Sequence, residues 1–293
     1  MQHTPVLTKE LIENLSPLPN ENFIDATLGF GGHARLILEK TSPSGKLLGI
    51  DQDINALEEA KTRLKDFGGR VTFVKANFNE LGLLVRPWEK EIHGIVLDLG
   101  VSTYQLTDAT RGFTFSKDAP LDMRMDQDNN NLTAAQVANK FSEKELAKII
   151  FEFGEERFSR QIAAQIVDSR RIKPIETTLQ LVEVIRRAIP ASNRVEQKIH
   201  FATRTFQALR IYVNSELDYL KNVLPQAVQI LSPGGRIAVI AFHSLEDRIV
   251  KHFFAENDLL EVLTRKPVSA TSEEMHLNPN SRSAKLRVAM KRG

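Results

Sequence analysis

Short apolar runs alternate with amphipathic segments along the first hundred residues. The runs at 23–24, 46–50, 70–75 and 94–98 have the length of buried strands, and helical patterns lie between them. Another helical pattern precedes the first run, with Thr8 in a suitable position to cap it. Strands that alternate with helices form a parallel sheet covered by helices on both faces. The pattern therefore predicts an α/β fold.

A different pattern follows after residue 100. Residues 107–131 are polar and irregular, and residues 133–219 show helical periodicity, including a capping box in which Glu145 follows Ser142 by three positions. A tight turn at 231–235, an apolar run at 236–242 and strand patterns at 260–266 and 284–291 then resume the sheet. The sequence predicts a mainly helical substrate-recognition domain (109–209), inserted into a sheet domain made of residues 1–108 and 210–293.

The loop after the first predicted strand carries the main candidate chemistry. Asp25 precedes a glycine-rich turn, and an amphipathic run follows it. Glycines let the backbone bend sharply and approach a ligand, and free N–H groups at the helix start face whatever binds there. The pattern departs from the dinucleotide fingerprint and is similar to the adenosylmethionine loop of Rossmann-like methyltransferases, with Thr27 in place of the usual first glycine. An ordinary glycine-rich turn is the alternative.

Acidic residues end three of the predicted strands: Asp25, Asp51 and Asp98. Ligands in open α/β sheets bind beyond the carboxyl ends of the strands, so we expect these acids to converge. Asp51 has the spacing of an acid that binds a ribose diol, whereas Asp53 is better placed to cap the following helix. Phe78, after the third strand, either packs on an adenine ring or belongs to the core.

The fifth predicted strand ends in a second polar group. His243, Ser244 and Asp247 follow it directly, and they are candidates for contact with a base or for proton removal. A cap at the end of the strand is the alternative for His243. A Pro-Gly-Gly turn before this strand, with a terminal strand pair after it, is typical of Rossmann-like methyltransferases and not of nicotinamide dehydrogenases.

Composition narrows the class of protein further. The chain has 293 residues, is 42% hydrophobic and 26% charged, and contains no cysteine, which excludes disulfides, thiolate metal sites and a cysteine nucleophile. No ligand spacing suggests another metal site. No apolar run is long enough to span a membrane and no signal peptide is evident, so we expect a cytoplasmic protein without membrane contact.

The net charge is only +2, so any surface for nucleic acid must be a local patch. Basic side chains are frequent between residues 157 and 210, and acids offset only part of their charge. This pattern favours a phosphate-binding surface on the helical insertion, with ordinary solvated helix faces as the alternative.

Several longer strings together resemble one family. On these strings the chain is identified as a member of the RsmH family, formerly MraW, and the resemblance runs from residue 3 to residue 290. The strings include Gly31-Gly-His33, Leu97-Asp-Leu-Gly-Val-Ser102, Arg111-Gly-Phe-Thr-Phe115, Leu121-Asp-Met-Arg-Met125, Gly154-Glu-Glu-Arg-Phe158, Ala202-Thr-Arg-Thr-Phe-Gln-Ala208 and Phe242-His-Ser-Leu-Glu-Asp-Arg248.

The resemblance implies a Rossmann-like class I methyltransferase that takes part in rRNA processing. Such an enzyme transfers a methyl group from S-adenosyl-L-methionine to N4 of a specific cytidine in the decoding region of 16S rRNA of the small ribosomal subunit. It places the cofactor on Gly31, Gly32, His33, Asp51, Phe78, Asp98 and Gln105. Only the resemblance, and not the pattern of residues, points to His33 and Gln105.

This chain departs from the family pattern in two places. Where the family usually has Ser-Ser-Pro before the glutamine, it has Ser102-Thr-Tyr104, which affects the loop near the methyl group. The segment at 268–280 is shorter than in many members.

The implied reaction requires catalysis because the N4 lone pair of cytosine is delocalised into the ring, which makes the amine a poor nucleophile. Acceptors for the amino protons localise that lone pair, and Asp98 with the carbonyls of 99–101 occupies the expected place. His243 is the second catalytic candidate.

The cytosine must leave its stack to reach the pocket. Phe113, Phe115 or Tyr104 could stack on it, and the candidates for phosphate contact are Arg111, Arg124, Arg204 and Arg210.

Three alternative functions remain open from the sequence. They are an amino-methyltransferase for another nucleic acid, a nicotinamide-dependent oxidoreductase and a catalytically silent cofactor-binding RNA chaperone. Asp25 and the Pro-Gly-Gly turn argue against the oxidoreductase, and the intact loop at Asp98 argues against the chaperone. Free rRNA or an assembled subunit, and a monomer or a homodimer, are equally compatible with the sequence.

Overall fold

The computed structural model describes residues 5–88, 90–101, 108, 110–195 and 199–293, without the side chains of 194 and 195. The chain divides into two compact units. The sheet unit consists of Met1–Gly100 and Leu217–Gly293, and the helical unit of Val101–Glu216. This division differs from the expected boundaries at 108/109 and 209/210. The reason is that Val101, Leu209 and Val213 pack with the core of the helical unit.

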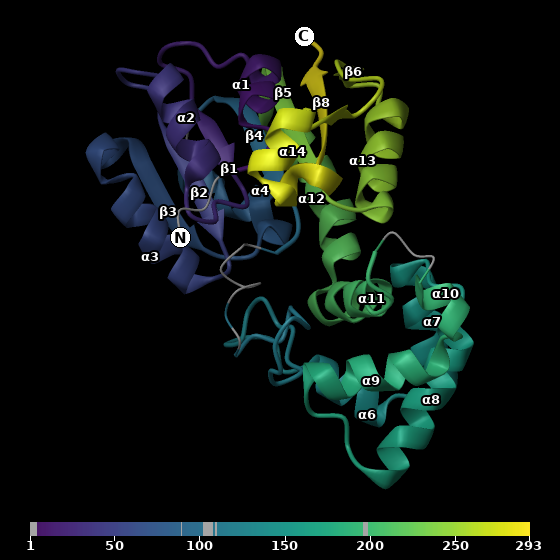
Figure 1. Ribbon diagram of the computed structural model, residues 1–293. Coiled ribbons are helices and arrows are strands. Elements are labelled where there is room, and N and C mark those ends of the chain that lie inside the picture. Colours follow the sequence, from purple (N-terminus) through teal and green to yellow (C-terminus); the bar gives the residue numbers. More distant parts are fainter. Residues whose placement is uncertain (1–4, 89, 102–107, 109, 196–198) are drawn as a thin grey trace. The chain divides into compact units, whose positions relative to one another are not determined.

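The sheet unit contains a mostly parallel sheet in the strand order β3-β2-β1-β4-β5-β8-β6, with β7 paired to β8 (Figure 1). The first five strands are parallel, and β8 is antiparallel to β5, β6 and β7. The predicted α/β fold is confirmed. The strands are β1 (Phe23–Asp25), β2 (Leu47–Asp51), β3 (Val71–Lys75), β4 (Ile92–Asp98), β5 (Leu231–Ala241), β6 (Leu260–Val262), β7 (Val268–Ser269) and β8 (Lys285–Lys291).

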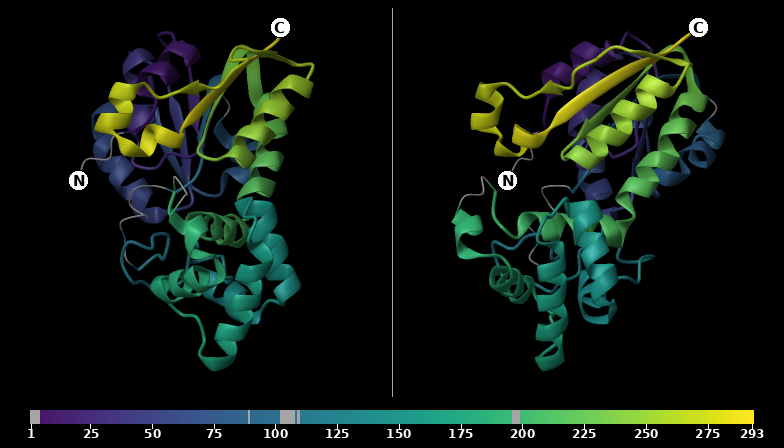
Figure 2. Two further views of the ribbon diagram at one scale, coloured as in Figure 1. Left: turned by 45° about the vertical axis from the view of Figure 1, so that its right-hand side comes forward. Right: turned by 90° about the vertical axis from the view of Figure 1, so that its right-hand side faces the viewer.

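Helices cover both faces of this sheet (Figures 1 and 2). Phe23 faces a core built with α1, α2 and α3, whereas its neighbour Ile24 faces a core built with α4, α12 and α13, because successive side chains of a strand alternate between faces. The α-helices are α1 (Thr8–Leu15), α2 (Gly32–Lys40), α3 (Ile54–Arg63), α4 (Leu81–Leu84), α12 (Glu216–Ile230), α13 (Ser244–Glu256) and α14 (Ser272–Leu277), and the 3-10 turns are η1 (Lys65–Arg70), η2 (Phe78–Glu80), η3 (Arg86–Trp88) and η4 (Pro279–Ser283).

Two local expectations were wrong in detail. Thr8 does not cap α1: Leu7 holds the N-cap position in the left-handed conformation, with no side-chain hydrogen bond. The expected turn at 231–235 lies inside β5, where the pairing with β4 jumps from Leu231 opposite Ile92 to Arg236 opposite Gly94. The intervening residues bulge out of the ladder.

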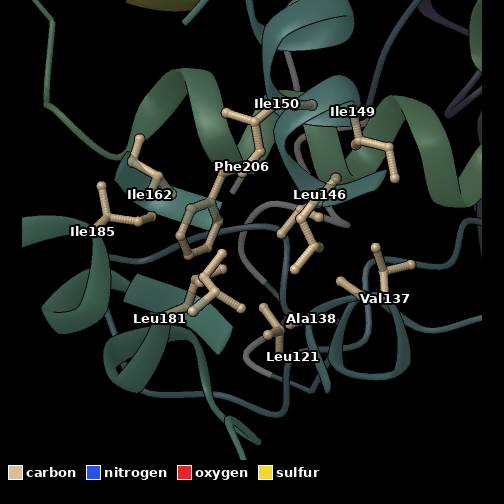
Figure 3. Packing of buried hydrophobic residues seen from close by; sticks show 14 of the residues in the cluster. Leu121, Val137, Ala138, Leu146, Ile149, Ile150, Ile162, Leu181, Ile185 and Phe206 are labelled. Carbon is tan, nitrogen blue, oxygen red and sulfur yellow. The ribbon is translucent and has the colours of Figure 1, made fainter. Parts of the chain in front are cut away.

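The helical unit has its own apolar core (Figure 3). Leu146 and Ile150 of α7, Ile162 of α8, Leu181 of α9 and Phe206 of α11 meet there. The predicted capping box of Ser142 and Glu145 at the start of α7 is confirmed. The helices are α6 (Ala134–Lys140), α7 (Glu143–Gly154), α8 (Ser159–Ile172), α9 (Thr178–Ala188), α10 (Ala191–Val195) and α11 (Thr203–Asn214).

Among the described residues, none of the helices combines the length and the apolar character that crossing a membrane requires.

Candidate cofactor site

The carboxyl ends of three neighbouring strands bring the predicted acids to one edge of the sheet. Asp25 ends β1, Asp51 ends β2 and Asp98 ends β4. β1 lies between β2 and β4 and is parallel to both. The chain runs from β1 through β2 to β3 on one side and then returns to β4 on the other side of β1. This edge is therefore the switch point at which open α/β sheets bind ligands.

Backbone geometry and packing explain the glycines of the loop after β1. Gly31 is the N-cap residue of α2 and has a φ of +72°, a conformation that favours glycine. A Cβ atom on Gly31 would lie 2.9 Å from Cδ1 of Leu64, and one on Gly32 would lie 2.8 Å from Cγ of Pro5. Both glycines therefore let α2 start close to neighbouring protein atoms.

Asp51 ties the glycine loop to the end of β2. Its Oδ2 accepts a hydrogen bond from the backbone N–H of Gly29 at 2.8 Å, and its Oδ1 accepts one from that of Asp53 at 2.9 Å. The N–H of Gln52 also donates to this carboxylate, and the acceptor capacity that remains on the two oxygens suits the hydroxyls of a ribose. Burial raises the pKa of Asp51 to about 6.

The neighbouring acid has the structural role expected for it. Asp53 is the N-cap residue of α3, and its Oδ1 accepts a hydrogen bond from the backbone N–H of Asn55 at 3.0 Å. The prediction that Asp53 caps this helix is confirmed.

Asp98 is fixed through its backbone and keeps one carboxyl oxygen unsatisfied. Its N–H donates to Oγ1 of Thr27 at 2.6 Å. Oδ1 is buried without a hydrogen-bond partner among the described residues. Burial raises the pKa of Asp98 to about 7, and the carboxylate of Glu246 adds to this effect. A buried acceptor of this kind can take a hydrogen bond from a donor that does not belong to the described residues, such as a ligand.

Asp25 is almost completely buried, with 1% of its surface exposed. Its Oδ1 accepts a hydrogen bond from the backbone N–H of Thr27 at 3.2 Å. Burial raises its pKa to about 7, against the opposing effects of His33 and the Thr27 N–H.

His33 lies in the first turn of α2 and bridges two segments. Its Nε2 is 2.8 Å from the carbonyl oxygen of Val6, and its Nδ1 is 3.5 Å from Oδ2 of Asp98. Burial lowers its pKa. The residue pattern did not single out His33, because its position beside Asp98 depends on how the β4 end meets the glycine loop.

Phe78 is the candidate for packing on the adenine, Gln105 is a further cofactor candidate, and Tyr104 is a candidate for stacking on the cytosine. Phe78 starts η2, is half-buried and packs against the core shared by α4, α12 and α13. Gln105 and Tyr104 lie outside the described residues.

His243 has the capping role that the sequence left as the alternative to catalysis. It is the N-cap residue of α13, where its Nδ1 accepts a hydrogen bond from the Glu246 N–H at 3.4 Å. Glu246 reaches back to the backbone N–H groups of Phe242 and His243. Asp247 forms an ion pair with Arg287 at 2.6 Å. A catalytic role of His243 stays a prediction.

The helical unit uses most of the predicted RNA-binding side chains internally. Arg111 is 5% exposed and donates to the carbonyls of Arg124 and Met125, and Phe113 is 7% exposed. This burial argues against the predicted contacts of Arg111 and Phe113 with RNA, because neither side chain offers a surface to a partner.

The other candidates are less buried. Arg124 forms a two-point ion pair with Asp122, and Arg210 forms one with Glu216. Arg204 is half-buried and donates to the carbonyl of Glu155 at 3.2 Å. Contacts of these three arginines with RNA stay predictions.

Comparison with known proteins places this arrangement in a family. The model of the MraW methylase family matches residues 1–292. The chain belongs to the MraW methylase family. The predicted resemblance is thereby confirmed.

Relatives of this MraW methylase cover almost its whole length. Proteins named ribosomal RNA small subunit methyltransferase H are 49% identical in Heliobacterium mobile, covering 99% of this chain and 98% of the relative, and 51% identical in Thermotoga neapolitana, covering 98% and 95%. A solved methyltransferase from Streptococcus mutans in complex with SAH has a TM-score of 0.48 and 12% identity, covering 99% of both chains. At that level, the likeness adds nothing about individual residues.

The residues of this methylase fit S-adenosylmethionine, the predicted methyl donor, and membership of a methyltransferase family agrees with it. Asp51 offers acceptors at the switch point, Asp98 has an orphaned buried oxygen, and the acids Asp25, Asp51 and Asp98 suit a positively charged sulfur. Within the described residues, no lysine or arginine is among the groups that shift the pKa of these three acids, and a cationic ligand stabilises the ionised form of such buried acids.

Proposed function

We propose that this protein transfers a methyl group from S-adenosylmethionine to small-subunit ribosomal RNA, at N4 of a cytidine in the decoding region of 16S rRNA. The names of relatives that share about half of its residues support rRNA as the substrate. The observation that carries the chemistry is the buried Oδ1 of Asp98 at the end of β4, which has no hydrogen-bond partner in the part of the chain that the structure describes.

Asp51, Phe78, His33, Asp98 and the loop at Gly31 are the residues that would hold the cofactor. When bound, S-adenosylmethionine supplies a methyl carbon attached to a positively charged sulfur, which an amine can attack. Asp51 would accept hydrogen bonds from the ribose diol through the acceptor capacity that the N–H groups of Gly29, Gln52 and Asp53 leave on its carboxylate. Phe78 would pack on the adenine.

Asp98 would act on the amine. A carboxylate that accepts an amino N–H localises the nitrogen lone pair and stabilises the positive charge that develops on nitrogen. The pKa of about 7 makes this carboxyl an effective acceptor for a proton near neutral pH. Asp98 is better placed for this role than His243, because both ring nitrogens of His243 face Glu246: Nδ1 accepts its backbone N–H, and Nε2 lies 3.2 Å from its Oε1.

Radiolabelled S-adenosylmethionine and small ribosomal subunits from cells that lack this enzyme test the proposal. We expect the label in N4-methylcytidine from one site after digestion of the RNA. Asp98→Asn should abolish labelling. Asp218→Asn should not, since the Asp218 side chain is 73% exposed on α12. Label in another nucleoside, or in no RNA at all, would contradict the proposed substrate.

A further inference from the structure

The hydrogen bond between His33 and Val6 fixes which ring nitrogen of His33 carries a proton. Nε2 lies 2.8 Å from a carbonyl oxygen, which can only accept. Nε2 must therefore be the N–H donor. In the neutral imidazole, Nδ1 then presents a lone pair, and burial favours this neutral form.

That lone pair faces another acceptor. Nδ1 is 3.5 Å from Oδ2 of Asp98. If Asp98 is ionised and His33 is neutral, two acceptors oppose each other without a proton between them. One proton on the pair removes this conflict, either on the carboxyl or on Nδ1.

The groups around the pair are mainly acidic. Asp25 at the end of β1 acts on His33, and so does Glu274 of α14. Glu246 of α13, which is paired with His243, acts on Asp98. Asp98 itself and Asp51 of β2 both act on Asp25. No lysine or arginine of the described chain is among the groups that shift the pKa of Asp98, so added negative charge on the pair is disfavoured until a cation arrives.

We infer that the His33–Asp98 pair gives up one proton when the positively charged methyl donor binds and regains one during methyl transfer, so that the product complex holds the pair protonated. This inference rests on the proposed function. Asp98 is then ionised while the positively charged sulfonium is bound, and it is protonated while the neutral thioether is bound.

Charge and atoms balance in this step. The bond between N4 and the methyl carbon forms while the bond from that carbon to sulfur breaks, and its electron pair stays on sulfur. The amine then gives one of its protons to Oδ1 of Asp98. The carboxyl becomes neutral, so Oδ2 no longer opposes the lone pair of His33 Nδ1 with a negative charge. The site loses the positive charge of the sulfonium and the negative charge of Asp98 together.

Proton-linked calorimetry tests the inference on the intact protein. S-adenosylmethionine and S-adenosylhomocysteine are titrated near neutral pH in two buffers of different ionisation enthalpy. We expect the two ligands to differ by about one proton, because binding is linked to protons wherever the two states hold different numbers of them. As the pH is raised through the range in which the pair titrates, the ratio of the affinities for the methyl donor and the product should therefore increase by up to about tenfold per pH unit.

Two variants test whether the proton that distinguishes the two ligands belongs to the His33–Asp98 pair. Asp98→Asn should abolish the proton difference between the ligands, whereas Asp25→Asn should keep it, although Asp25 is also a buried acid with a pKa of about 7. Carbon-13 NMR of the Asp98 carboxyl in the wild-type protein provides an independent measurement. It should report an ionised group with the donor and a protonated group with the product.

Each outcome separates the inference from the proposed function. If both ligands bind with the same proton release, the inference is wrong and the proposed function stands. A difference that survives in Asp98→Asn and disappears in Asp25→Asn would assign the proton to Asp25 and overturn the role of the pair. If the wild-type protein binds neither ligand, the proposed function fails and the inference fails with it.

Discussion

The hydroxyl oxygen of Thr27 accepts a hydrogen bond from the backbone N–H of Asp98 at 2.6 Å. The two residues are 71 positions apart, and the bond joins the loop after β1 to the carboxyl end of β4. It fixes the backbone that carries the orphaned carboxyl. Thr27 stands where methyltransferase loops usually have glycine, so this chain gains an anchor that a glycine could not supply.

Thr27→Val tests this anchor. The substitution keeps the shape of the side chain but leaves the Asp98 N–H without its acceptor, so the free energy of unfolding should fall by about 1–3 kcal/mol. Thr27→Ser keeps the hydroxyl and should remain closer to the wild type. Urea unfolding and titration with S-adenosylmethionine measure both effects. Equal stability of the two variants would show that the bond contributes nothing.

Gly31→Ala should damage the start of α2. The added Cβ meets Leu64, and the φ of +72° is unfavourable for alanine; the conformation alone costs about 1–2 kcal/mol. Gly69→Ala is the matched control, because a Cβ there has no neighbour within 4 Å. We expect a lower midpoint of thermal unfolding and weaker cofactor binding for Gly31→Ala only. A loss of similar size in both variants would contradict this explanation.

The buried acid Asp25 should make stability depend on pH. Its pKa is about 7 in the folded protein, against an ordinary value of 3.8. The folded state therefore binds the proton more tightly, and stability falls as the pH rises through this window and is lowest above it. Asp25→Asn removes the titration. The variant should match the wild type at about pH 3, below both pKa values, and exceed its free energy of unfolding by on the order of 2–4 kcal/mol at about pH 8.

Urea unfolding of the ligand-free protein at both pH values checks this prediction. A variant that is less stable than the wild type to the same extent at both pH values would contradict it, since the substitution would then act through packing and not through charge.

Arg204→Ala tests the proposed RNA surface of the helical unit. If this guanidinium holds a phosphate, its loss should weaken RNA binding and make the dependence on salt shallower, while the affinity for S-adenosylmethionine stays the same. Arg35→Ala is a suitable control, because Arg35 is exposed on α2 and paired with Glu39. Binding of small-subunit RNA measured over a series of salt concentrations distinguishes the two variants. An unchanged salt slope for Arg204→Ala would exclude the phosphate contact.

Local features of the structure followed from the sequence, whereas its long-range contacts did not. The cap at Asp53 and the capping box at Ser142 depend on residues two or three positions apart, and both were predicted correctly. The bonds of His33 to Val6 and of Thr27 to Asp98 join residues 27 and 71 positions apart. No spacing rule reveals such pairs.

Burial limited the prediction of the RNA-binding residues in the same way. Arg111 was assigned to phosphate because it is basic and lies in an irregular polar segment. The structure instead folds that segment around its side chain, which donates to the carbonyls of Arg124 and Met125. Charge alone does not show whether an arginine serves a partner or its own backbone.

Titration of the protein with S-adenosylmethionine tests the central claim most directly, namely that the acids at the carboxyl edge of β1, β2 and β4 form the cofactor site. The wild type should bind one equivalent. Asp51→Asn should weaken binding at least about tenfold, as expected when a hydrogen bond to a charged group is lost. Asp53→Asn, two residues away, should preserve binding, because asparagine also caps helices. Absence of binding by the wild type, or equal binding by all three proteins, would contradict the account.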